Sequence, residues 1–75
     1  MTKLKRVTAA EMVRALRRAG FLEDRQEGSH VTLYSITAGR RVTVLMHTGD
    51  MSVRLTHKIL KQAGLTADDL RCLLG

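Results

Sequence analysis

The chain has 75 residues, of which 44% are hydrophobic, and it carries 13 lysines and arginines against seven aspartates and glutamates. A chain of this length buries only about 60% of the surface that it exposes when unfolded, so two separately stable cores are excluded and residues 1–75 form a single domain. The net charge of +6 favours a polyanionic partner, above all nucleic acid.

The cysteine content and the hydropathy pattern restrict the cellular setting. Cys72 is the only cysteine, so an internal disulfide is excluded and a reducing compartment is expected. No apolar run approaches the roughly 18 residues of a membrane span or forms a signal peptide at the N-terminus. We therefore expect a cytoplasmic protein with no membrane association.

The first predicted element is a helix that begins after Thr8 and ends near Ala19. Thr8 and Glu11 have the spacing of a capping box, and Gly20 is a typical residue for ending a helix. The apolar residues recur at helical spacing and form one stripe, which consists of Ala9, Met12, Val13 and Leu16.

Three strands are predicted next, over residues 21–25, 30–36 and 41–46. A turn at Glu27-Gly28-Ser29 separates the first two strands, and a tight turn at Thr37-Ala38-Gly39-Arg40 joins the second and third. A hairpin centred between Ala38 and Gly39 places an apolar face toward the helices, formed by Val31, Leu33, Ser35, Val42, Val44 and Met46. The other face is mostly polar and should meet water or a ligand.

Two further helices complete the chain. One is predicted from about Val53 to Ala63 and ends at Gly64, with Leu55, Ile59 and Leu60 turned inward. A final short helix begins at Thr66, which has capping-box spacing to Asp69, and buries Leu70 and Leu73. The order helix, three strands, helix, short helix predicts an α+β fold of two layers.

Two histidines are candidates for chemistry on the polar face. The expected register places His30 directly opposite His47, with their Cβ atoms about 4.5–5.5 Å apart. Cleavage of RNA by its own 2′-hydroxyl needs one group that takes a proton and one that gives a proton, and imidazole suits both tasks near neutral pH. Such chemistry needs no metal.

Two other interpretations of the histidines stay open. Cross-strand histidines on an exposed face can be solvated surface residues without a role. A zinc site from His30, His47 and His57 is a further option, although these residues and the distant Cys72 match no usual ligand spacing.

Three linked segments carry a resemblance to a known family: Arg25-Gln26-Glu27-Gly28-Ser29-His30, Arg41-Val42-Thr43-Val44 with His47, and Ile59 to Leu65. In this order and spacing the chain resembles the HicA toxins. The resemblance implies a double-stranded-RNA-binding-domain-like fold, with the helices on one face of a three-stranded antiparallel sheet. It further implies a toxin that cleaves messenger RNA without a cofactor, with His30 as the catalytic histidine and a HicB-like antitoxin as partner.

The candidate site extends from His30 to neighbouring residues. His47 is a second, weaker candidate for proton transfer. Gly28 and Ser29 either position the phosphate or only form the turn. Tyr34 either stacks on a base or only shields the hairpin. The candidate RNA-binding residues are Arg25, Arg41, Arg54, Lys58 and Lys61. The last three share a helix face, and this face tracks phosphates, docks an acidic antitoxin or is solvated without a role. The cluster of Arg14, Arg17 and Arg18 on the first helix is also a candidate for docking the antitoxin.

Two departures from the family pattern motivate an alternative function. Glu27 stands where the family usually has lysine, and a carboxylate there would repel phosphate. Leu45 stands where proline is common. The alternative is a non-catalytic RNA-binding or antitoxin-binding module of the same fold.

Overall fold

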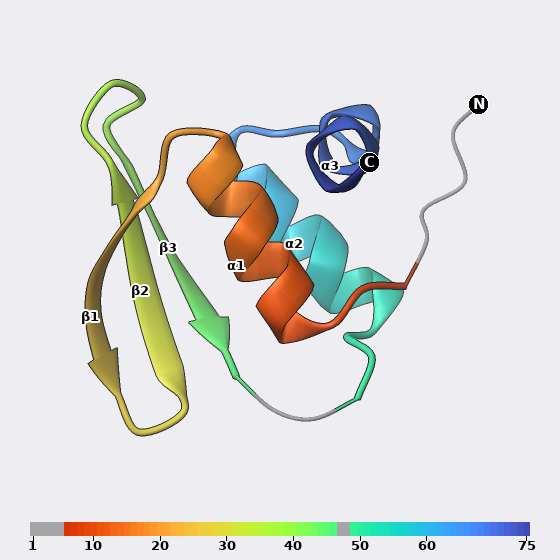
Figure 1. The fold of residues 1–75 in the computed structure, drawn as a ribbon, viewed down its shortest axis with the longest axis horizontal. Helices are drawn as coiled ribbons and strands as arrows, with labels where there is room; N and C mark the ends of the chain where they lie inside the picture. Colours follow the sequence, from red (N-terminus) through yellow and green to blue (C-terminus); the bar gives the residue numbers. More distant parts are fainter. Residues whose placement is uncertain (1–5, 47–48) are drawn as a thin grey trace.

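The computed structural model describes residues 6–46 and 49–75. The chain forms an antiparallel sheet of three strands in the order β1-β2-β3, and the helices lie together on one side of this sheet (Figure 1). The elements are α1 (Ala9–Arg18), β1 (Leu22–Glu27), β2 (His30–Ser35), β3 (Arg40–Leu45), α2 (Val53–Ala63) and α3 (Ala67–Leu74). The expected α+β fold of the double-stranded-RNA-binding-domain type is therefore confirmed.

Local sequence signals set the helix ends. The Thr8 hydroxyl accepts a hydrogen bond from the Glu11 amide at 3.1 Å, while the Glu11 carboxylate accepts one from the Thr8 amide at 2.9 Å. Thr66 and Asp69 make the same reciprocal pair at the start of α3. Both predicted capping boxes are confirmed, because each satisfies amides that have no partner within the first turn.

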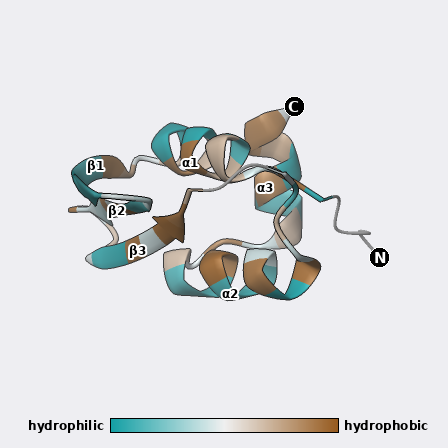
Figure 2. Ribbon diagram, turned by 90° about the horizontal axis from the view of Figure 1, so that it is seen from below, coloured by the Kyte–Doolittle hydropathy of each residue, from teal (hydrophilic) through white to brown (hydrophobic). Residues whose placement is uncertain are grey.

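The core lies between the helices and one face of the sheet. Both α1 and α2 alternate between hydrophobic and hydrophilic segments along their length, as amphipathic helices do (Figure 2). The larger buried side chains come from all layers and are Met12, Leu16, Phe21, Val31, Leu33, Val42, Val44, Met51, Ile59, Leu60 and Leu70. No helix in the described part of the chain is long and apolar enough to cross a membrane.

The first strand lies further along the chain than its predicted range of 21–25. Phe21 precedes the strand and is buried in the core, where its amide donates to the Leu16 carbonyl at 2.9 Å and closes the end of α1. The register against β2 shifts between Glu23 and Arg25, so β1 contains a bulge at this point. Hydropathy did not reveal the bounds of this strand because its six residues are all exposed.

The register of the β2–β3 hairpin differs from the prediction by two residues. His30 lies opposite Leu45, and Leu33 lies opposite Val42, so the expected pairing of His30 with His47 is wrong. The cause is the loop, which spans residues 36–39 and is closed by the Gly39 amide donating to the Ser35 carbonyl at 2.8 Å. His47 itself lies outside the described residues.

The division of the sheet into two faces survives this correction. A shift of two residues leaves every side chain on its original face, because side chains alternate with a period of two along a strand. Of the predicted inner residues, Val31, Leu33, Ser35, Val42 and Val44 are buried, and Met46 is partly buried against the core. We call the opposite side, with His30, Thr32, Tyr34, Arg41 and Thr43, the open face.

Candidate functional site

A two-residue turn places His30 at the start of β2. Gly28 and Ser29 connect the two strands, and Glu27 pairs with His30 across the turn. Gly28 has a φ of 58°, and no atom lies within 4 Å of the position that a Cβ would take there. Conformation rather than crowding therefore explains the glycine.

The backbone on the other side of His30 is also fixed. The Met46 amide donates to the Ser29 carbonyl at 2.6 Å, so the end of β3 is tied to the turn between β1 and β2. His30 thus lies on the central strand between two hydrogen-bonded neighbours, while its side chain is exposed. A rigid backbone with an accessible imidazole suits a group that must meet a substrate.

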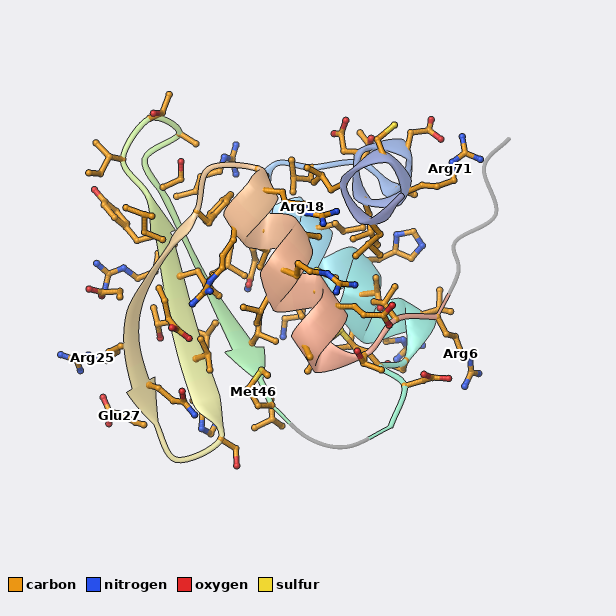
Figure 3. The ribbon with its side chains drawn as sticks, in the orientation of Figure 1. Arg6, Arg18, Arg25, Glu27, Met46 and Arg71 are labelled. Carbon is orange, nitrogen blue, oxygen red and sulfur yellow. The ribbon has the colours of Figure 1, made fainter. Side chains whose placement is uncertain are left out.

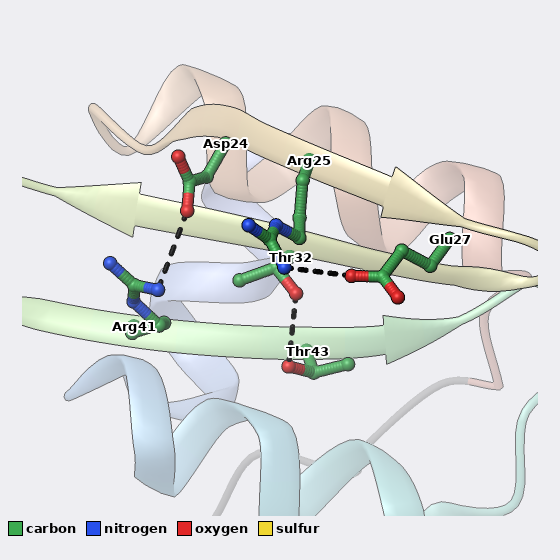
Figure 4. Close-up of polar contacts among 6 residues, drawn as sticks. All are labelled: Asp24, Arg25, Glu27, Thr32, Arg41 and Thr43. Atoms are coloured by element: carbon green, nitrogen blue, oxygen red, sulfur yellow. Dashed lines mark hydrogen bonds and ion pairs between the residues drawn. The ribbon is translucent and has the colours of Figure 1, made fainter.

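Four side chains surround a shallow depression of about 200 Å³ on the open face: Arg25, Glu27, His30 and Thr32. The Arg25 guanidinium binds the Glu27 carboxylate at 2.8 Å (Figure 4). Both side chains project from the outer margin of β1, away from the helices (Figure 3). The depression therefore brings together an imidazole, a guanidinium, a carboxylate and a hydroxyl.

A second polar row crosses the sheet beside this depression. The Thr32 and Thr43 hydroxyl oxygens are 3.4 Å apart across β2 and β3. One row further along, the Arg41 guanidinium lies 5.3 Å from the centroid of the Tyr34 ring and reaches Asp24 at 3.4 Å. Tyr34 is therefore covered in part by Arg41, a cation–π contact, rather than left bare for stacking.

The predicted basic residues fall into separate places. Arg25 shares the depression with His30, whereas Arg41 and Lys58 line a groove of about 460 Å³ between β3 and α2. Arg54 and Lys61 are exposed on α2 and line neither hollow. The structure thus divides the five candidates into two sites and two isolated cations.

Two of the three arginines of α1 have partners within the domain. Arg17 binds Glu23 of β1 at 2.9 Å, and Arg18 donates to the Leu73 carbonyl of α3. These contacts join α1 to the sheet and to the last helix. In the cluster of Arg14, Arg17 and Arg18, the presence of Arg17 and Arg18 is therefore explained by these structural contacts.

Sequence reasoning did not single out the threonine pair or the groove between β3 and α2. Under the expected register Thr32 faced Leu45, so its proximity to Thr43 was hidden. The groove residues Leu55 and Gln62 gave no signal, because one was assigned to the core and the other had no evident role. The correct position of this four-residue loop, at residues 36–39 rather than 37–40, would have revealed the threonine pair.

The zinc interpretation depended on His30, His47 and His57, of which His47 lies outside the described residues. His57 lies on α2 and Cys72 on α3, whereas His30 is on the sheet. Among residues 6–46 and 49–75, no group of three or more histidine, cysteine, aspartate or glutamate side chains could hold a metal ion.

Comparison with known proteins gives the family. A family model described as "HicA toxin of bacterial toxin-antitoxin" matches residues 9–65, which extend from α1 to the residue after Gly64. The chain belongs to the HicA toxin family. No curated protein matches the sequence.

Membership of the HicA family fixes the broad role of the domain. It is the toxin of a toxin–antitoxin system, and this implies an antitoxin as its partner. The matched residues include the whole sheet, the Gly28-Ser29 turn, His30 and α2. The depression on the open face and the groove between β3 and α2 therefore both belong to the HicA domain.

Proposed function

We propose that this HicA toxin is an endoribonuclease that cleaves messenger RNA with His30 as a proton-transfer group. The observation that carries the proposal is the exposed imidazole of His30 in one depression with the Arg25 guanidinium and the Thr32 hydroxyl. A phosphate in this depression would meet a base or acid, a positive charge and a hydrogen-bond donor. These are the groups that phosphodiester cleavage by an internal nucleophile requires.

The reaction that fits these groups is transesterification within the RNA strand. The 2′-hydroxyl loses its proton to a base as its oxygen bonds to phosphorus, and the bond from phosphorus to the 5′ oxygen breaks as an acid protonates that oxygen. His30 performs one of these two transfers, and His47 is the candidate for the other. Arg25 stabilises the extra negative charge that develops on the phosphoryl oxygens.

Neighbouring residues position the strand in this proposal. Gly28 allows the tight approach of the backbone, and the Ser29 hydroxyl donates to a phosphoryl oxygen. Among the remaining cations, Arg41 and Lys58 line a groove and hold phosphates of the RNA. Arg54 and Lys61 lie outside this groove and only attract the RNA at long range. A HicB-like antitoxin in the cytoplasm would cover the open face and keep the toxin inactive.

The test is cleavage of RNA by the purified full chain in the presence of EDTA. We expect cleavage to persist with the chelator and to fall by about 10²–10⁴-fold in His30→Ala, because a general acid or base contributes this much. His57→Ala is the matched control, since His57 is an exposed histidine on α2 outside both hollows. Undiminished cleavage by His30→Ala would contradict the assignment.

His47→Ala separates the two proton roles. A loss as large as that of His30→Ala supports His47 as the second acid or base, and an unchanged rate assigns the second transfer to another group. Loss of cleavage with EDTA alone would replace the proposed mechanism by one that uses a metal.

A non-catalytic binding module is the second candidate, and the contact between Arg25 and Glu27 favours it. The carboxylate of Glu27 occupies the guanidinium that a phosphate would need. Expression in bacterial cells distinguishes the two functions, because an active ribonuclease arrests growth and His30→Ala does not. RNA binding without cleavage or growth arrest would establish the module.

A further inference from the structure

The groove between β3 and α2 has the features of a second binding site. Its walls are Arg41 and Thr43 on the strand and Leu55, Lys58, Ile59 and Gln62 on the helix. Its volume of about 460 Å³ lies within the about 300–1,000 Å³ that is common for small-ligand sites. The groove therefore has cations at its rim and apolar side chains within it.

The two walls of this groove are held together. The Arg40 guanidinium at the start of β3 donates to the Gln62 carbonyl near the end of α2, at 3.3 Å. Arg41 is in turn fixed by its contacts with Asp24 and Tyr34. The groove is thus a preformed feature of the fold rather than a gap between independent elements.

The groove adjoins the depression at His30 through the threonine pair. Thr43 lines the groove, Thr32 lines the depression, and their hydroxyl oxygens are 3.4 Å apart. His30 and Thr43 are diagonal neighbours in the register, a relation with a spacing of about 7–8 Å in antiparallel sheets. A chain that leaves the depression therefore reaches the groove within about one nucleotide.

We propose that this groove binds the nucleotide next to the cleaved phosphate on a single RNA strand. The inference rests on the proposed ribonuclease function and names the form of its substrate. The base lies in the groove against Leu55, the Gln62 amide meets its polar edge, and Arg41 and Lys58 hold the adjoining phosphate.

The geometry selects a single strand over a duplex. A base can enter the groove only when it is unpaired and turned out of its stack, and single-stranded segments allow this. In a duplex the bases are paired with each other and the protein meets chiefly phosphates and sugars. The fold resembles a duplex-binding domain, but the groove predicts preference for unpaired RNA.

The experiment measures binding of the full-length protein to a fluorescent single-stranded 2′-O-methyl RNA, which lacks the nucleophile and cannot be cleaved. Lys58→Gln removes the groove charge, and Lys61→Gln makes the same change on the same helix outside the groove. We expect Lys58→Gln to weaken binding about fivefold. The slope of the logarithm of the binding constant against the logarithm of the salt concentration should become shallower by about 0.7, the value for one phosphate of a single strand. Lys61→Gln should change affinity by less than about twofold.

A neutral variant tests the base site itself. Gln62→Trp fills the groove without changing charge, so it should weaken binding of the single strand while leaving the circular dichroism spectrum unchanged. A duplex of the same sequence should compete poorly against the labelled strand. Equal losses in Lys58→Gln and Lys61→Gln, or equal competition by the duplex, would overturn the groove as a nucleotide site.

Cleavage assays on the same proteins separate this inference from the proposed function. If wild-type protein cleaves RNA while the two lysine variants behave alike, only the groove is wrong. If the strand binds with the predicted dependence on Lys58 but is never cleaved in its unmodified form, only the ribonuclease proposal fails. Absence of any binding to RNA would overturn both.

Discussion

The two faces of β2 and β3 differ sharply although they come from the same twelve residues. On the covered face Val31, Leu33, Val42 and Val44 are no more than 2% exposed. On the open face the alternate positions carry an imidazole, two hydroxyls, a phenol, a guanidinium and the exposed side chain of Leu45. Because strand side chains alternate in direction, the fold can keep one face for packing while the other varies with function.

The edge strand β1 does not follow this division. Its residues opposite Val31 and Leu33 are Gln26 and Glu23, and all six of its side chains are exposed. The helices therefore cover the central and third strands but leave the first outside the core (Figure 1). This places Arg25 and Glu27 at an accessible margin, where a polyanion or a partner protein can reach them.

The largest expected effect tests whether the covered face carries the stability. Leu33→Ala removes a fully buried side chain, so we expect the free energy of unfolding to fall by about 2–5 kcal/mol. Thr32→Ala changes the adjacent residue on the open face and should cost no more than about 0.5 kcal/mol. Unfolding in urea, followed by circular dichroism, measures both, and similar losses would contradict the separation of the two faces.

An intermediate effect is expected where α2 meets β3. Gly64 ends α2 in the left-handed region with φ 75°, and a Cβ there would lie 2.8 Å from Nε of Arg40. Gly64→Ala should therefore lower the free energy of unfolding by about 1–2 kcal/mol. Gly64→Asn is the matched variant, because asparagine tolerates this conformation better, and it should recover part of the loss in the same urea experiment.

The sequence was most informative where a structural signal is local. Ser52 accepts a hydrogen bond from the Leu55 amide and Gly64 ends the same helix, so the predicted range of 53–63 for α2 matches the structure. The faces of the hairpin also followed from alternation. Its register did not, because four-residue loops at 36–39 and at 37–40 both contain Gly39 and a slip of two residues preserves the apolar pattern.

The candidate site was predictable only in part for the same reason. His30 and Arg25 lie within one short segment of sequence, and the structure places them in one depression. The groove combines residues from β3 and α2, which are adjacent only after folding, so no spacing in the sequence reveals it. Sites made of one turn can be recognised early, whereas sites between elements need the register.

The smallest expected effect concerns Glu27, whose carboxylate binds Arg25 at the depression on the open face. Its bond to Arg25 joins two side chains that are 67% and 71% exposed, so the pair itself adds little to stability. A phosphate that enters the depression competes with this carboxylate for the guanidinium. Glu27→Gln should therefore tighten binding of the 2′-O-methyl strand by about two- to fivefold, the range that an exposed ion pair allows.

A matched carboxylate distinguishes this local competition from a general effect of charge. Glu23→Gln changes the net charge equally and also breaks an ion pair of β1, but its partner is Arg17 of α1 rather than Arg25. Arg25→Ala combined with Glu27→Gln should abolish the gain, because the freed guanidinium is then absent. An equal gain in Glu23→Gln would mean that the affinity for RNA depends on overall charge, and it would contradict a specific phosphate site on the open face.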